Sequence, residues 1–170
     1  MSIRRANIQD ASSIAAISIE VWIGTYLKQG VTAFFAQYVL DTFTEAKIAA
    51  RLSDPNEVFF VSDNAEGIDG FIALTQASAA LVSERSGTEI STFYVQPRHH
   101  GKGVGKRLLA AGLHHCRTQG GEAVWLTTNA ENTPAIAFYL AQGFTHVGET
   151  HFTIEDQAYL NNVYACSLAP

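Results

Sequence analysis

The chain has 170 residues, of which 47% are hydrophobic, and a formal net charge of −5 at pH 7. This length and composition predict one domain, residues 1–170, with a full core, and the acidic balance argues against a nucleic-acid partner. No apolar run approaches the roughly 18 residues of a membrane span, and polar residues follow Met1 where a signal peptide would be apolar. The two cysteines, Cys116 and Cys166, are far apart, which argues against a disulfide framework or a zinc site. We therefore expect a cytoplasmic protein without a membrane partner or a metal.

Hydrophobic periodicity and turn signals predict helices and strands throughout the chain. Asp10, Thr32 and Thr44 are the expected N-caps of three helices, and Asn132 or Thr133 is the expected cap of a later one. In the first half of the chain we predict a strand at 2–6, the three capped helices, and strands at 58–62 and 70–75 joined around 64–69. A polar loop at 77–87 follows. In the second half we predict a strand at 89–95, a helix at 104–118, a strand at 123–127, a helix that stops at Gly143, and strands at 144–150 and 163–168. Because helices alternate with strands only in the second half, this order predicts a mixed sheet with helices on both faces.

The most informative segment is residues 98–105, Arg-His-His-Gly-Lys-Gly-Val-Gly, which we call the anion loop. Its three alternating glycines allow a tight turn that presents successive N–H groups to one point. The helix that follows adds unpaired N–H groups and the positive end of its dipole. Lys102, Lys106, Arg98 and Arg107 add positive charge. The segment therefore predicts a binding site for an anion, most often a phosphate.

Two common phosphate loops do not fit this segment. A Walker loop requires Ser or Thr after Gly-Lys, but Arg107 follows Gly105-Lys106, so the hydroxyl that binds magnesium is missing. A dinucleotide fingerprint requires Gly-x-Gly-x-x-Gly, and the glycines here are Gly101, Gly103 and Gly105. Neither a nucleoside triphosphate nor a dinucleotide is therefore the expected ligand.

A third pattern fits the segment better. Arg98-x-x-Gly101-x-Gly103 resembles the pyrophosphate loop of the GNAT acetyltransferases, whose pattern is Arg/Gln-x-x-Gly-x-Gly/Ala. The preceding Phe93-Tyr94-Val95-x-Pro97 resembles the strand that leads into that loop.

A second motif supports the resemblance, which covers nearly the whole chain. It is Asn132-x-x-Ala135-x-x-Phe138-Tyr139-x-x-x-Gly143-Phe144, and the order of predicted elements agrees as well. The resemblance implies an α/β (α+β) protein with the GNAT fold. That fold has a central, splayed, mixed but mostly antiparallel sheet of six to seven strands, with helices on both faces.

The resemblance also assigns a co-substrate, acetyl-CoA, and the residues that bind it. Backbone N–H groups of the anion loop would hold the pyrophosphate, and the Val95 backbone would pair with the pantetheine arm between Phe93 and Tyr94. Asn132 would bond the pantetheine amides, although it already serves as a helix cap. The implied coenzyme-binding residues are Phe93, Tyr94, Val95, Arg98, Gly101, Lys102, Gly103, Val104, Gly105, Lys106 and Asn132.

The implied chemistry is direct attack of a primary amine on the thioester in a ternary complex. Tyr139 matches the family tyrosine that protonates the leaving thiolate, and Phe138 beside it is expected in the core. Glu89 shares a strand face with Phe93 and Val95 and is the first candidate for the general base. Glu20 is the second, and a water is a third possibility. No cysteine is placed as an obvious nucleophile for an acyl-enzyme.

The acceptor is less readable than the donor. Ile19-Glu20, Thr25-Tyr26 and Glu57-Val58-Phe59-Phe60 are similar to segments of the PaiA-type spermidine/spermine acetyltransferases, as is His151-Phe152. That resemblance implies a polyamine-like amine near Glu20, Trp22 and Tyr26. The rings of Trp22 and Tyr26 could face a cation.

Two alternatives stay open. One is a non-catalytic acyl-CoA-binding regulatory module. The other is an enzyme that acetylates a protein N-terminus or a free amino acid. Dimers are frequent in the GNAT family, so a homodimer is an expected assembly that the sequence itself does not test.

Overall fold

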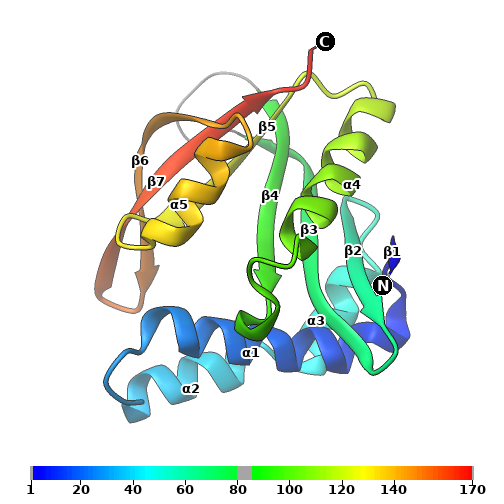
Figure 1. Ribbon diagram of the computed structural model, residues 1–170. Coiled ribbons are helices and arrows are strands. Elements are labelled where there is room, and N and C mark those ends of the chain that lie inside the picture. The colour runs from blue at the N-terminus through cyan, green and yellow to red at the C-terminus, as the bar shows by residue number, and fades with distance from the viewer. Residues whose placement is uncertain (1, 80–85, 170) are drawn as a thin grey trace. The chain divides into compact units, whose positions relative to one another are not determined.

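The structure, a computed structural model, describes residues 2–79 and 86–169 (Figure 1). Its strands form a seven-stranded sheet in the order β1-β2-β3-β4-β5-β7-β6. The elements are β1 (Ser2–Arg5), α1 (Ala11–Tyr26), α2 (Ala33–Thr42), α3 (Glu45–Leu52), β2 (Glu57–Asn64), β3 (Gly67–Ala79), β4 (Ser86–Val95), α4 (Val104–Thr118), β5 (Ala123–Asn129), α5 (Thr133–Ala141), β6 (Thr145–Ile154) and β7 (Gln157–Ser167).

The sheet is mixed and mostly antiparallel, which confirms the predicted fold class. β1 is antiparallel to β2, and β7 is antiparallel to both β5 and β6. β4 is parallel to β5, with Thr88 opposite Val124 and Glu89 opposite Trp125. A parallel pair needs a crossover connection, and α4 is the helix between these two strands.

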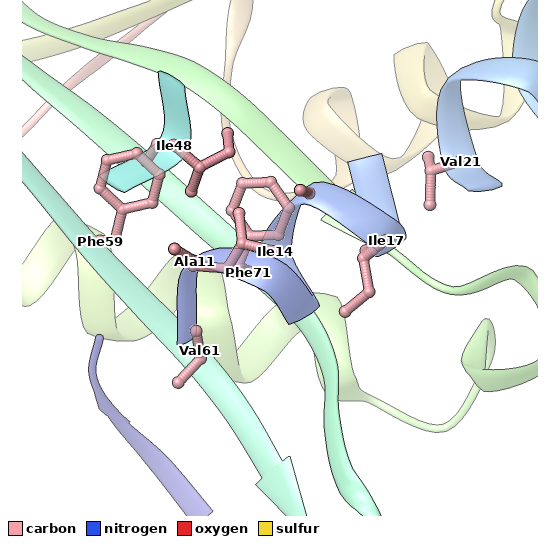
Figure 2. Packing of buried hydrophobic residues seen from close by; sticks show 10 residues of the cluster. Ala11, Ile14, Ile17, Val21, Ile48, Phe59, Val61 and Phe71 are labelled. Atoms are coloured by element: carbon pink, nitrogen blue, oxygen red, sulfur yellow. The ribbon is translucent and has the colours of Figure 1, made fainter. Parts of the chain in front are cut away.

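The chain divides into two compact units. The first unit comprises Met1–Ala73 and Thr92–Gly112, and the second comprises Leu74–Ser91 and Leu113–Pro170. The core of the first unit is built from one face of α1, one residue of α3 and the inward residues of β2 and β3 (Figure 2). Its buried members are Ala11, Ile14, Ala15, Ile17, Val21, Ile48, Phe59, Val61, Phe71 and Ala73. Ile14, Ile17 and Val21 of this core lie on one face of α1, at the spacing by which hydrophobic periodicity predicts a helix.

The predicted caps Thr32, Thr44 and Asn132 are confirmed, and Asp10 occupies the N-cap position of α1 without making a capping bond. The Thr32 and Thr44 hydroxyls accept hydrogen bonds from Phe35 and Lys47 N–H, as expected for caps.

Asp10 precedes α1 but makes no capping bond to it. Its carboxylate accepts bonds from the Arg4 guanidinium at 2.8 Å and from the Asn7 N–H at 2.9 Å. Asn7 instead caps a short 3₁₀ turn, Ile8–Asp10, through the Gln9 N–H. The charge-assisted contact with Arg4 competes successfully for the side chain that the sequence pattern assigns to the helix.

The predicted loop at 77–87 is wrong at both ends. β3 continues to Ala79 and β4 begins at Ser86, and residues 80–85 lie outside the described part of the chain. Glu89 is therefore inside β4 and does not open it. Pairing with a neighbouring strand can extend a strand beyond the residue types that favour strands. Thr88, opposite Val124 of β5, is an example.

The second unit is organised around α5, β6 and β7. α5 lies against the hairpin of β6 and β7 (Figure 1), where the Tyr139 ring packs 5.7 Å from Phe144 and 6.4 Å from Tyr164, centroid to centroid. Tyr139 is 7% exposed and Phe138 is only half-buried, so Tyr139 is the more deeply packed of the two. Within residues 2–79 and 86–169, no helix has the length and apolarity needed to cross a bilayer.

Candidate active site

The anion loop has the backbone that its glycines predict. After β4 ends at Val95, a 3₁₀ turn at Pro97–His99 leads into the loop, and α4 begins at Val104. Gly101 and Gly103 have φ values of +74° and +78°, in the left-handed region that favours glycine. Gly103 C=O accepts the first helical bond, from the Arg107 N–H at 3.2 Å. The glycines are therefore required by the turn that starts the helix.

The first turn of α4 carries backbone N–H donors that have no partner within the helix. These donors are the N–H groups of Gly103, Val104, Gly105 and Lys106. The carbonyl groups four residues before them lie outside the helix, so they are not placed to accept helical hydrogen bonds. A Cβ atom built on Gly101 or Gly103 would meet no atom within 4 Å. With the positive end of the helix dipole, these donors make a site suited to a phosphate.

Cationic side chains surround this site. Lys102, Lys106 and Arg107 are exposed. Arg98 is also 64% exposed, but its Nη1 lies 3.2 Å from Glu20 Oε1 on α1. Arg98 is therefore paired with a carboxylate, although most of its side chain is exposed.

Glu20 is tied to the base of the loop through both of its oxygens. Besides the Arg98 contact, its Oε2 accepts a hydrogen bond of 2.6 Å from the Gln96 amide. Gln96 follows β4 directly and is buried. The His100 ring Nε2 lies 2.9 Å from Val95 C=O. The structure thus joins Glu20, which the sequence analysis expects near the acceptor, to the anion loop.

Asp69 is a residue of this site that the sequence reasoning missed. It lies on β3, is 1% exposed, and its Oδ2 is 3.7 Å from His99 Nδ1 and 3.0 Å from the Asn64 amide nitrogen. Its backbone C=O accepts a hydrogen bond from Gln96 N–H. The signal available in the sequence was a carboxylate inside an apolar strand, Gly67-Ile68-Asp69-Gly70, because buried acids are rare without a partner.

The next residue, Gly70, allows β3 to approach β4, which precedes the loop, and α4, which follows it. A Cβ atom at Gly70 would lie 2.9 Å from Tyr94 C=O, 3.1 Å from Val95 Cγ2 and 3.2 Å from Leu108 Cδ1. No side chain fits there without a shift of backbone atoms. Asp69 is therefore held at a fixed place beside the end of β4 and the first turns of α4.

Aromatic rings gather on α1 and α2 in the first unit. Trp22 is 4% exposed and lies 5.0 Å from Tyr26, 5.8 Å from Phe35 and 5.2 Å from Tyr38, between ring centroids. Partial burial raises the pKa of both Tyr26 and Tyr38, so both phenols stay neutral at physiological pH. Trp22 is a core residue, and Tyr26, which is 39% exposed, is the most exposed ring of this group.

The residues of β4 that precede the loop are half-buried. Tyr94 packs edge-on against Phe71 with 5.8 Å between ring centroids, and it borders the core of the first unit. Its ring therefore has a packing role, as do many aromatic strand residues. Phe93 and Val95 are half-buried in the same strand.

The second unit carries the remaining predicted site residues. Tyr139 is buried on α5, where its ring also lies 5.6 Å from that of Phe138. Asn132 caps α5, because its Oδ1 accepts a bond of 3.3 Å from the Ala135 N–H. Glu89 is half-buried in β4 and opposite Trp125 of β5.

Cys116 lies at the other end of α4 from the anion loop. It is 2% exposed and borders a small cavity of about 120 Å³ with Gln76, Thr88, His115, Gln119 and Gly121. Burial raises the pKa of its thiol, which disfavours the thiolate that an acyl-enzyme needs. In the described part of the chain, no cluster of three His, Cys, Asp or Glu side chains could hold a metal ion.

Comparison with known proteins assigns the family. The sequence profile of the Acetyltransferase (GNAT) family matches residues 22–144, which is more than half of the chain. The chain belongs to the GNAT acetyltransferase family. The matched range includes the anion loop, Glu89 and Tyr139, so the sequence resemblance is confirmed at the level of the family.

Relatives and solved structures agree with this assignment. A mycothiol acetyltransferase of Corynebacterium glutamicum is 38% identical over 100 residues, which are 59% of this chain and 32% of that protein. The chain spans about a third of the length of this relative. An uncharacterized N-acetyltransferase of Lactobacillus delbrueckii is 24% identical over 149 residues, covering 87% of this chain and 86% of that protein.

Two solved structures share the fold at low identity. The PaiA N-acetyltransferase of Thermoplasma acidophilum, in complex with coenzyme A, has a TM-score of 0.75 at 18% identity and covers 95% of this chain and 96% of its own. The acetyltransferase yncA of Salmonella typhimurium, with acetyl-CoA, has a TM-score of 0.72 at 20% identity, with coverage of 100% and 95%.

Proposed function

We propose that this protein transfers the acetyl group of acetyl-CoA to a primary amine of a small molecule. The observation that carries the proposal is the anion loop, in which Gly101 and Gly103 adopt positive φ, a Cβ atom built on either glycine meets no atom within 4 Å, and the first N–H groups of α4 have no partner within the helix. A pyrophosphate is the chemical group that such a loop binds best. Family membership selects acetyl-CoA among the molecules that carry one.

The donor would be held mainly by backbone groups of the first unit. The N–H groups from Gly101 to Lys106 would bind the pyrophosphate, and Lys102 and Lys106 would add screened attraction. The Val95 backbone would pair with the pantetheine arm, and Phe93 and Tyr94 would shape the strand beside it. Asn132 would bond the pantetheine amides through its Nδ2, since its Oδ1 is used by the helix cap.

The reaction would be a direct transfer. The amine nitrogen attacks the thioester carbonyl carbon, a C–N bond forms, and the C–S bond breaks. The Val95 N–H would polarise the carbonyl oxygen. Glu89, or a water that it orders, would take the proton released by the amine, and Tyr139 would protonate the departing thiolate of CoA. Cys116 takes no part, because its buried thiol does not favour the reactive form.

The acceptor would bind beside α1 and α2. Tyr26 offers an exposed ring face, and Glu20 offers a carboxylate that is 38% exposed, which together suit a cationic amine. Glu20 stays the second candidate for the base, and both of its oxygens accept hydrogen bonds from residues beside the loop. A polyamine-like acceptor fits this chemistry. The relatives named for mycothiol point to another small molecule, but the chain covers only a part of their length.

The deciding experiment measures release of the CoA thiol by the purified protein with acetyl-CoA and a panel of amines. The panel contains a polyamine, small amino compounds, free amino acids and a peptide with a free N-terminus. Turnover with small amines alone supports the proposal. Turnover only with the peptide or amino acids supports the second enzymatic alternative, and tight CoA binding without turnover supports a regulatory module. Absence of CoA binding by calorimetry would contradict all three.

A further inference from the structure

Asp69 and His99 form a contact between strand β3 and the turn that enters the anion loop. The distance from Asp69 Oδ2 to His99 Nδ1 is 3.7 Å, which is an ion-pair distance when the imidazole is protonated. Asp69 is 1% exposed, whereas the His99 side chain is 22% exposed. The carboxylate is thus fixed in the interior, and the imidazole is the partner that can exchange a proton with solvent.

The hydrogen bonding of Asp69 is incomplete. Oδ2 accepts a bond from the Asn64 amide, but Oδ1 is buried and has no hydrogen-bond partner. A buried carboxylate is stable when a nearby positive charge or several donors compensate it. Among the described residues, His99 is the group that forms an ion pair with Asp69. A neutral His99 would leave this charge without compensation.

Other charged residues near His99 in the chain, or on the strand that precedes β3, have other partners or are exposed. Arg98, before it, pairs with Glu20 of α1, and Asp63 at the end of β2 pairs with Arg4. The exposed Lys102, whose backbone N–H lies 3.4 Å from His99 C=O, precedes α4. These surroundings leave Asp69 as the carboxylate that faces His99.

We propose that Asp69 is a positioning residue of the anion loop, which it holds by pairing with protonated His99, so that coenzyme affinity depends on the His99 proton. This inference rests on the proposed function, because it takes the pyrophosphate of CoA as the ligand of the loop. When His99 is protonated, the pair fastens the 3₁₀ turn to β3, and the imidazolium adds positive charge beside the loop. When His99 loses its proton, both contributions disappear and the anion is bound more weakly.

The test is the affinity for CoA, measured by calorimetry from pH 6 to pH 8.5. The proteins are the wild type, Asp69→Asn, His99→Asn and the double variant. His114→Asn is the control, because His114 is an exposed histidine on α4 beyond the loop. Ionisation of the CoA phosphates contributes equally to every curve, so the comparison is between proteins.

We expect the wild-type dissociation constant to rise about fivefold more across this range than that of either single variant. The single variants and the double variant should give the same flattened curve, and His114→Asn should follow the wild type. Parallel curves for the wild type, Asp69→Asn and His99→Asn would overturn the proposal. A purely structural role of Asp69 would weaken binding equally at every pH, which is also a contrary result.

A second measurement does not depend on CoA. Ring ¹H and ¹⁵N resonances of His99, assigned by their loss in His99→Asn, report its protonation in the free protein. We expect His99 to keep its proton to higher pH in the wild type than in Asp69→Asn. If Asp69→Asn does not fold, resonances that show a neutral wild-type ring at every pH of the titration would overturn the pairing. If the wild type binds no CoA at any pH, the proposed function fails, and the resonances still decide the pair.

Discussion

Glu20 and Arg98 lie 78 residues apart in the chain, and their side chains form an ion pair with 3.2 Å between Oε1 and Nη1. The contact joins the helix proposed for the acceptor to the loop proposed for the coenzyme. It also places a negative charge beside an anion site. Coenzyme pyrophosphate and Glu20 would therefore compete for the same guanidinium.

Replacing Glu20 with Gln should strengthen coenzyme binding. The substitution releases Arg98 and removes the nearby negative charge, and exposed pairs of this kind contribute up to about 1 kcal/mol. We expect the CoA dissociation constant to fall about two- to fivefold by calorimetry. Glu66→Gln, at an exposed turn, changes the net charge equally and should leave affinity unchanged. Weaker binding in Glu20→Gln would show that Glu20 supports the loop more than it competes.

Replacing Gly103 with Ala should weaken coenzyme binding by about tenfold, which is about 1.4 kcal/mol. Gly103 has φ +78°, which an alanine adopts at a cost of about 1 kcal/mol, and its methyl group would enter the space open to the phosphates. Gly120→Ala is a matched control, because Gly120 has φ +76° and equally open surroundings after α4 ends. Both variants should lose similar stability in urea, and only Gly103→Ala should lose CoA affinity. Equal CoA affinity in the two variants would contradict the loop assignment.

Replacing Tyr139 with Phe should lower kcat about a hundredfold and leave CoA affinity nearly intact. The ring contacts with Phe144 and Tyr164 are retained, so the fold should be little affected. Tyr164→Phe removes a hydroxyl from the neighbouring buried ring and serves as the control. Steady-state kinetics with the best amine of the panel give the result. An unchanged kcat in Tyr139→Phe would remove its proposed role as the acid.

Replacing Glu89 with Gln should also lower kcat about a hundredfold, because an amide cannot accept the proton of the amine. The loss should diminish as the pH rises and more of the acceptor amine is already deprotonated in solution. The control is Glu122→Gln, an exposed carboxylate before β5. If rate profiles from pH 6 to pH 10 show the same factor throughout, Glu89 orients substrate and is not the base.

Replacing Asp10 with Asn should destabilise the protein at neutral pH but not in acid. Hydrogen bonds from Arg4 hold the pKa of Asp10 below its usual value of 3.8. A lowered folded-state pKa gives stability that is complete above about pH 4 and is lost as the pH falls through the folded value. Because Arg4 is about one-third exposed, we expect Asp10→Asn to lower the free energy of unfolding by about 1 kcal/mol at pH 7.

The measurement is urea unfolding at pH 7 and at successively lower pH. Asp41→Asn, at an exposed position on α2, should match the wild type throughout. If the free energies of unfolding of Asp10→Asn and the wild type still differ by the same amount below pH 2, the carboxylate charge is not the cause of the lost stability.

Local features were predicted well because their causes are local. The turn at Gly101 and Gly103 needs positive φ, and this need is visible in the residue types alone. Thr32 and Thr44 cap helices through bonds to residues three positions later. Asp10 occupies the expected N-cap position of α1, but its carboxylate bonds to the Arg4 guanidinium and not to a helix N–H.

The sequence by itself determined the family, the turn of the anion loop and most of the helices and strands. It did so because glycine spacing, caps and periodicity act within one turn or one strand. Only the tertiary structure decided that Glu20 meets Gln96 and Arg98, and that Asp69 meets His99. These pairs join residues from distant parts of the chain, and their strength depends on burial, which no local pattern of residues records.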